Sequence, residues 1–126
     1  MAGILTRTGV VAILAGLAGA LAAPAAATLP GEHVFQSKCT ICHATVAGGK
    51  KIGPSLFGVV GRTSGTLPGF AYSPAMKAAA KVWTPAELRL YIASPRTAVP
   101  GNRMMYAGTT TPQELDDLVA YLQSLK

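Results

Sequence analysis

The sequence predicts a single all-α domain in which short helices are joined by long loops. Three observations support this fold class. Two segments in the second half repeat one helix-start pattern, the C-terminus carries an apolar stripe at helical spacing, and residues 44–70 are rich in Gly and Pro without any period. The chain has 126 residues, 50% of them apolar and 13% charged. This length suits one domain of about 100 to 150 residues and excludes a two-domain enzyme.

The first 27 residues differ in composition from the rest. Arg7 is their only charged side chain, an apolar run covers residues 10–23, and three alanines occupy residues 25–27. A basic start, an apolar centre and small residues before a cleavage site are typical of a secretory signal peptide. We therefore expect residues 1–27 to be removed on export to the periplasm. An uncleaved anchor is the alternative, because about 20 uncharged residues can cross a bilayer.

The remaining segment, residues 28–126, is expected to be one small basic domain. An apolar core alone gives limited stability at this size, so we expect a covalent link or a cofactor to support the domain. Ten Lys and Arg residues stand against five Asp and Glu, a net charge of +5. This charge favours acidic partners. The basic residues are scattered without aromatic residues between them, so no nucleic-acid partner is expected.

The first half of this domain is expected to be mostly loop. A short helix over residues 31–40 carries Val34 and Phe35 and leads into a cysteine motif. Residues 44–70 are expected to form a loop region, and so long an irregular stretch in a compact domain requires a large group beneath it. An Ala-rich segment, residues 73–81, predicts a further short helix before Trp83.

The last two helices are predicted from identical start patterns. Residues 84–87 and 111–114 each place Thr at the N-cap, Pro at the first helical position and Glu at the third, a capping box. The first helix should end before Pro95. The second should pack its apolar stripe against the N-terminal helix at Phe35. The stripe consists of Leu115, Leu118, Val119, Leu122 and Leu125.

The sequence Cys39-Thr40-Ile41-Cys42-His43 is the motif that indicates a specific chemistry. Cys-x-x-Cys-His is the signature of c-type haem attachment, in which both thiols add to haem vinyl groups and the histidine binds the iron. Residues three apart share one face of a helical turn, so both sulfurs can reach one edge of the porphyrin. One haem c, covalent through Cys39 and Cys42, would also supply the group beneath the long loop.

Other uses of the two cysteines agree less well with the sequence. A disulfide is usual in an exported chain, but the Cys-x-x-Cys-His spacing argues for haem. A redox dithiol lies near a βαβ pattern, and no such alternation is visible. A zinc site needs a fourth ligand, and His33, six residues before Cys39, is poorly placed to supply it. For a second iron ligand, the residues alone leave Met76, Met104 and Met105 open.

Taken in order, these motifs resemble class I cytochrome c, a family of mitochondrial and soluble bacterial monohaem proteins. The resemblance extends over residues 31–126 and implies three to five short helices and long loops wrapped around one haem c. The matching residues are Gly31, Phe35, the Cys-x-x-Cys-His motif, Gly53-Pro54-Ser55-Leu56-Phe57-Gly58, Gly61-Arg62, Pro68-Gly69-Phe70-Ala71-Tyr72-Ser73, Trp83, Tyr91, Pro95, Pro100-Gly101-Asn102-Arg103-Met104 and Leu118-Val119-Ala120-Tyr121-Leu122.

The resemblance also implies roles at the haem. His43 and Met104, which ends a Pro-Gly-x-x-Met pattern, are the implied iron ligands, and the carbonyl of Pro54 is the implied acceptor for His43. Such ligation raises the reduction potential and leaves no open site on the iron, so it implies an electron carrier and not an enzyme. The residues implied to contact the propionates or the methionine sulfur are Arg62, Tyr72, Trp83 and Tyr91.

Three residues depart from the family pattern. Asn102 stands where Thr is common, Met76 where Asn is common, and Arg103 where Lys is usual. We therefore expect different polar contacts near one propionate and a basic docking patch that contains fewer lysines. The cations expected around the exposed haem edge are Lys38, Lys50, Lys51, Arg96 and Arg103.

The implied function is to shuttle electrons as a periplasmic monomer. The donor would be a quinol-oxidising cytochrome complex, and the acceptor a terminal oxidase or a photosynthetic reaction centre. The alternative is the haem subunit of a periplasmic oxidoreductase complex. Membrane contact is expected only if residues 1–27 are retained. A ligand-binding or peroxidatic haem would require the bond to Met104 to be absent or easily broken.

Overall fold

The computed structural model describes residues 3, 22–23 and 26–126. The predicted signal peptide, residues 1–27, lies almost entirely outside the described residues. Its cleavage therefore stays a prediction. Within the described part of the chain, no helix is long and apolar enough to span a membrane.

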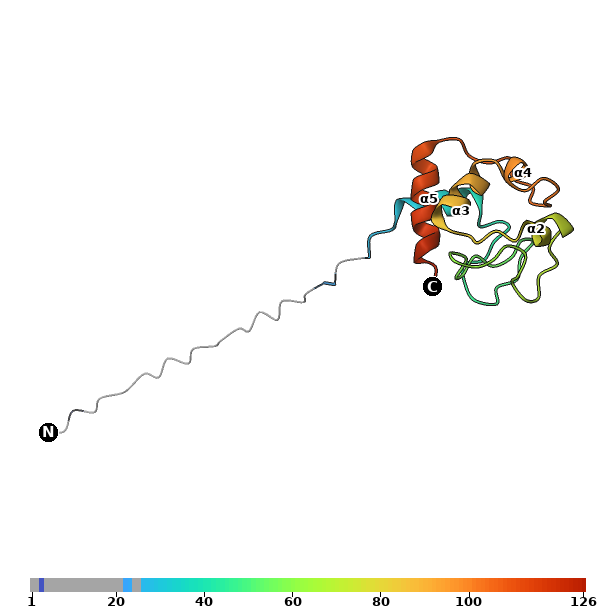
Figure 1. Ribbon diagram of the computed structural model, residues 1–126. Helices are drawn as coiled ribbons and strands as arrows, with labels where there is room; N and C mark the ends of the chain where they lie inside the picture. Colours follow the sequence, from blue (N-terminus) through green and yellow to red (C-terminus); the bar gives the residue numbers. More distant parts are fainter. Residues whose placement is uncertain (1–2, 4–21, 24–25) are drawn as a thin grey trace.

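Five helices account for the regular structure of the described residues, and the prediction of an all-α fold is confirmed (Figure 1). Each begins with Pro at its first or second position, where the missing N–H needs no intrahelical partner. Instead of a sheet, these residues form one isolated bridge between Thr63 and Val82. The helices are α1 (Pro30–Lys38), α2 (Pro74–Ala79), α3 (Pro85–Ala93), α4 (Pro95–Ala98) and α5 (Pro112–Ser124).

Helices α1 and α5 pack together as the sequence predicts, and α5 stands along one side of the domain (Figure 1). Phe35 is 1% exposed, and its ring lies 5.3 Å from that of Tyr121. The helices approach closely at Gly31, where a Cβ would lie 1.8 Å from the carbonyl oxygen of Asp117. Only glycine fits such a contact. The buried stripe of α5 consists of Leu115, Leu118, Val119 and Leu122.

Helix α4 was not predicted. Pro95 ends the preceding helix as expected, but it also occupies the first turn of a new four-residue helix and is fully buried there. A proline disfavours the helical conformation in the residue before it, yet is itself suited to a helix start. The chain therefore turns at Ser94 and immediately continues as α4.

The predicted capping boxes form only in part. Thr84 Oγ1 accepts a hydrogen bond from the backbone N–H of Glu87 at 3.2 Å, as expected for the N-cap of α3. Thr111 makes no such side-chain bond at α5, so that prediction was wrong. Neither glutamate completes a box, because Glu87 pairs with Lys81 and Glu114 pairs with Lys38. Contacts with distant residues have taken the place of the local ones.

The difference between these two caps predicts unequal effects of the same substitution. Thr84→Ala should lower the free energy of unfolding by about 1 kcal/mol, because it leaves an N–H of α3 without its acceptor. Thr111→Ala should change it by less than about 0.5 kcal/mol, because that hydroxyl makes no cap bond. Urea unfolding of both variants beside the parent protein tests this. Equal losses would contradict it.

Candidate haem site

The attachment motif forms one turn at the C-terminal end of α1. The backbone N–H groups of Cys42 and His43 both donate to the carbonyl of Cys39, at 3.0 and 2.9 Å. Both cysteines are free and partly buried. Two thiols and one imidazole are therefore presented by five consecutive residues on a single turn, the arrangement that the spacing predicts.

His43 is held in one orientation by the loop that follows it. Its Nδ1 lies 2.7 Å from the carbonyl oxygen of Pro54. A carbonyl can only accept, so Nδ1 carries the hydrogen and Nε2 keeps a free lone pair. Burial also lowers the pKa of His43. The bond to Pro54 opposes this shift, and the nearby positive charges of Lys51 and Arg62 add to it. The ring is therefore neutral near pH 7, with Nε2 available to bind a metal.

The contact between His43 and its loop depends on a glycine. The N–H of Gly53 donates to the carbonyl of Cys42 at 2.7 Å. A Cβ on Gly53 would lie 2.5 Å from Cε1 of His43. Any side chain there would displace the imidazole from the carbonyl of Pro54, so the Gly53-Pro54 pair sets the position of the ring.

The chemistry of the cysteines fits haem attachment better than zinc binding. Burial raises the pKa of the Cys39 thiol to about 11, whereas zinc binds the thiolate. Within the described residues no group of three or more His, Cys, Asp or Glu side chains could hold a metal ion, and His33 is exposed on α1. A neutral Cys39 thiol beside an oriented neutral imidazole suits covalent addition to an apolar vinyl group of a haem.

The three candidate methionines lie in different environments. Met105 is 96% exposed, and Met76, the buried residue of α2, is only 8% exposed in the core. Met104 is partly buried against the apolar core, with its sulfur 3.9 Å from the hydroxyl of Tyr91. Tyr91 itself is buried on α3, and burial raises its pKa to about 12, so its hydroxyl keeps its proton.

The three residues implied for the propionates come together around the bridge at residue 63. The N–H of Trp83 donates to the carbonyl of Arg62 at 2.9 Å, and the Trp83 side chain is buried. Arg62 is half-buried and donates through Nη2 to the carbonyl of Ser55 at 2.9 Å. Burial raises the pKa of Tyr72, and the nearby positive charge of Arg62 opposes that shift. The Arg62 guanidinium therefore lies near the Tyr72 phenol, and its backbone is bonded to that of Trp83.

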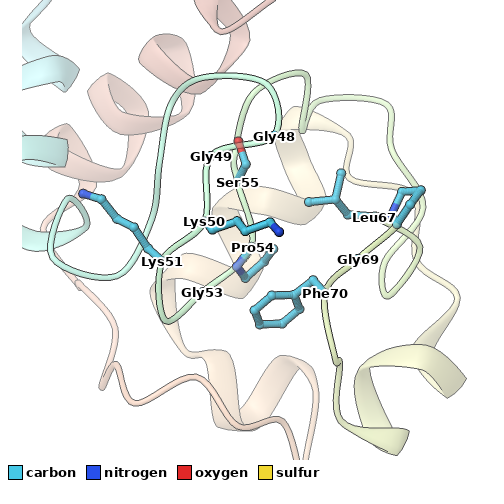
Figure 2. A pocket seen from close by; sticks show the side chains of 11 residues that line it. Gly48, Gly49, Lys50, Lys51, Gly53, Pro54, Ser55, Leu67, Gly69 and Phe70 are labelled. Carbon is cyan, nitrogen blue, oxygen red and sulfur yellow. The ribbon is translucent and has the colours of Figure 1, made fainter.

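A pocket of about 260 Å³ adjoins the segment that orients His43 (Figure 2). The side chains of Leu67 and Phe70 reach it from one loop, and Lys50 and Pro54 line it from the other. Sequence analysis did not predict this pocket, because it depends on how two irregular loops face each other. Asn102 was likewise known only as a departure from a pattern, and its contacts appear only in the structure.

Comparison with known proteins finds similarity over the whole helical domain. Residues 29–126 match the family model described as Cytochrome c. The chain is 46% identical over 104 residues to cytochrome c2 of Rhodopila globiformis, covering 82% of this chain and 98% of that protein. It is 48% identical over 102 residues to cytochrome c of Chlamydomonas reinhardtii, with coverages of 80% and 91%. The solved structure of cytochrome cH from Methylobacterium extorquens matches with a TM-score of 0.70 at 37% identity, covering 75% and 94%.

Proposed function

Because the chain belongs to the class I cytochrome c family, whose members bind one covalent haem c, we propose that it carries single electrons through a haem bound by His43 and Met104. One observation supports His43 as an iron ligand: the carbonyl of Pro54 holds the neutral ring so that Nε2 is free to bind a metal. The sulfur of Met104, partly buried beside Tyr91, would supply the second ligand. Attachment of the haem would be through Cys39 and Cys42.

The bound haem would supply reversible exchange between Fe(II) and Fe(III), and the protein would restrict the iron to that exchange. With His43 and Met104 both bound, no site is left for a third ligand, which favours electron transfer over catalysis. Buried Trp83 and Tyr91, whose rings lie 5.0 Å apart, would exclude water. The donors near Arg62 would bind the propionates, because buried carboxylates need hydrogen-bond partners.

The absorption spectrum of the purified protein tests this proposal. We expect a narrow c-type band in the reduced form, a weak far-red band from the methionine–iron bond in the oxidised form, and no response of the reduced form to carbon monoxide. A protein that binds carbon monoxide readily, or that lacks the far-red band, would have no stable methionine ligand. A ligand-binding or peroxidatic haem would then replace the electron-carrier proposal.

The proposed location is the periplasm, and the proposed partners are membrane-bound or periplasmic redox complexes. Intact mass and N-terminal sequencing of the secreted protein should show a chain beginning at Thr28. Retention of residues 1–27 would indicate a membrane anchor instead. Stoichiometric co-purification with a catalytic chain would favour the haem subunit of an oxidoreductase over a free carrier.

The docking surface is expected to be positively charged, but with less unpaired positive charge than the sequence suggests. Lys38 is paired with Glu114, and this contact raises the pKa of Lys38 and lowers that of Glu114. Lys51 donates to the carbonyl of Thr40 and so places its charge at the attachment motif. The remaining expected cations are Lys50, Arg96 and Arg103, and all three are exposed.

This charge predicts opposite salt effects with two small oxidants. Oxidation of the reduced protein by ferricyanide, an anion, should slow as ionic strength rises, and oxidation by tris(phenanthroline)cobalt(III), a cation, should accelerate. Lys51→Gln should weaken the salt dependence with ferricyanide. Lys77→Gln, an exposed lysine on α2, provides the matched control. If the stopped-flow rates with both oxidants do not change with ionic strength, charge steering at the haem edge is excluded.

A further inference from the structure

Asn102 makes more side-chain contacts than its place in an exposed loop suggests. Its Nδ2 donates to the carbonyls of Pro95 and Val99, at 2.9 and 2.8 Å. Its Oδ1 accepts from the backbone N–H of Met104 at 2.9 Å and lies 3.4 Å from the hydroxyl of Tyr91. An amide has two donor hydrogens and one oxygen with two lone pairs, so this side chain uses its full capacity.

The two donor contacts attach Asn102 to a buried part of the fold. Pro95 begins α4 and Val99 is its C-cap, and both residues are buried. The backbone N–H of Asn102 also donates to the carbonyl of Val99, at 3.1 Å. The carbonyls of a short helix need outside partners at its C-terminal end. At that end Asn102 donates to the carbonyl of Val99 from both its side chain and its backbone. Its second side-chain bond goes to the carbonyl of Pro95, which also accepts from the N–H of Val99, so Asn102 is held against both ends of α4.

The acceptor contact attaches the backbone of the segment that carries Met104, whose side chain packs against the core. Within the described residues, residues 103–108 make no backbone–backbone hydrogen bond, and pairing resumes only at Thr109. The side chains of Arg103 and Met105, on either side of Met104, are exposed. Among the described residues, the bond from Met104 N–H to Asn102 is thus the only hydrogen bond made by the backbone of this segment.

We propose that Asn102 is a positioning residue that clamps the backbone of Met104 to α4 and so keeps the methionine sulfur on the iron. This inference rests on the proposed ligation by Met104. A threonine hydroxyl has a single donor hydrogen, so it cannot bond both α4 carbonyls while accepting from Met104. The amide therefore gives this chain a connection between α4 and Met104 that the commoner residue could make only in part.

The clamp predicts how easily an added ligand displaces Met104. Imidazole can bind ferric iron only after the methionine leaves, so its rate of binding measures opening of the segment. Asn102→Ala should increase that rate about tenfold or more, since one lost hydrogen bond corresponds to as much as tenfold and several are lost. Asn102→Thr should restore part of the slow rate. The matched control, Met105→Ala, changes an exposed neighbour and should leave the rate unchanged.

Two measurements separate positioning from general destabilisation. Hydrogen exchange at the Met104 N–H, followed by NMR, should accelerate in Asn102→Ala well beyond exchange in α5. Far-UV circular dichroism in guanidinium should show that global unfolding changes too little to account for the imidazole rate. If Asn102→Ala does not fold, Asn102→Thr alone must bind imidazole faster than the parent.

Either of two results would overturn the proposal. One is an imidazole rate and a Met104 amide exchange rate that are both unchanged in Asn102→Ala. The other is an increase that Met105→Ala reproduces. Failure of the proposed ligation looks different, because the parent protein would then lack the far-red band before any substitution. Exchange at the Met104 N–H would still report whether the clamp exists.

Discussion

Replacing Met104 by Ala should remove the far-red band of the oxidised protein and allow the reduced protein to bind carbon monoxide stoichiometrically. The thioether is the proposed second iron ligand, and its loss would leave an open coordination site. The reduction potential should fall as well, because a thioether stabilises Fe(II) relative to Fe(III). Absorption spectra, carbon monoxide titration and potentiometry of the purified variant measure these three effects.

The neighbouring methionine provides the control for this result. Met105 is 96% exposed, so Met105→Ala should keep the far-red band and exclude carbon monoxide. Tyr91 Oη lies 3.9 Å from the sulfur of Met104. If Met105→Ala loses the band while Met104→Ala keeps it, the ligand has been assigned to the wrong methionine.

Gly31→Val should destabilise the domain more than any other single change at the helix contacts described above. A Cβ at this position would lie 1.8 Å from the carbonyl oxygen of Asp117 and 2.7 Å from Cβ of Tyr121. Helices α1 and α5 must then separate, which would uncover Phe35. We expect a loss of about 3 kcal/mol or more in the free energy of unfolding, the upper range for overpacked positions.

The appropriate control is the same side chain on the solvent face of the same helix. Gln36 is exposed on α1, so Gln36→Val introduces an equal β-branched residue without a clash. Its cost should stay below about 0.7 kcal/mol, the range of helix propensity. Guanidinium unfolding of both variants distinguishes the effects. Similar losses would show that helix propensity, and not the contact with α5, determines the result.

The local features of this protein follow from the sequence because each depends on residues that are neighbours in the chain. The spacing of Cys39, Cys42 and His43 places them on one turn, and the structure has that turn. Thr84 caps its helix as predicted, and the apolar stripe of α5 is buried against α1. The fold class could be predicted for the same reason, since short sequence patterns indicate where a helix begins, where it ends and which face is apolar.

The contacts between distant segments were decided by the tertiary structure. Glu114 fits a capping box by its spacing, yet it binds Lys38 instead, and the short helix after Pro95 forms where only a stop was expected.

The tertiary structure also decided which contacts Asn102 makes at the site. The sequence shows Asn102 as a departure from a family pattern, but its contacts with α4 and Met104 depend on how the chain folds back after α3. A side chain hydrogen-bonds to whatever partner the packed backbone brings within about 3 Å. Sequence patterns identify the groups able to form such bonds, and packing determines which of them meet.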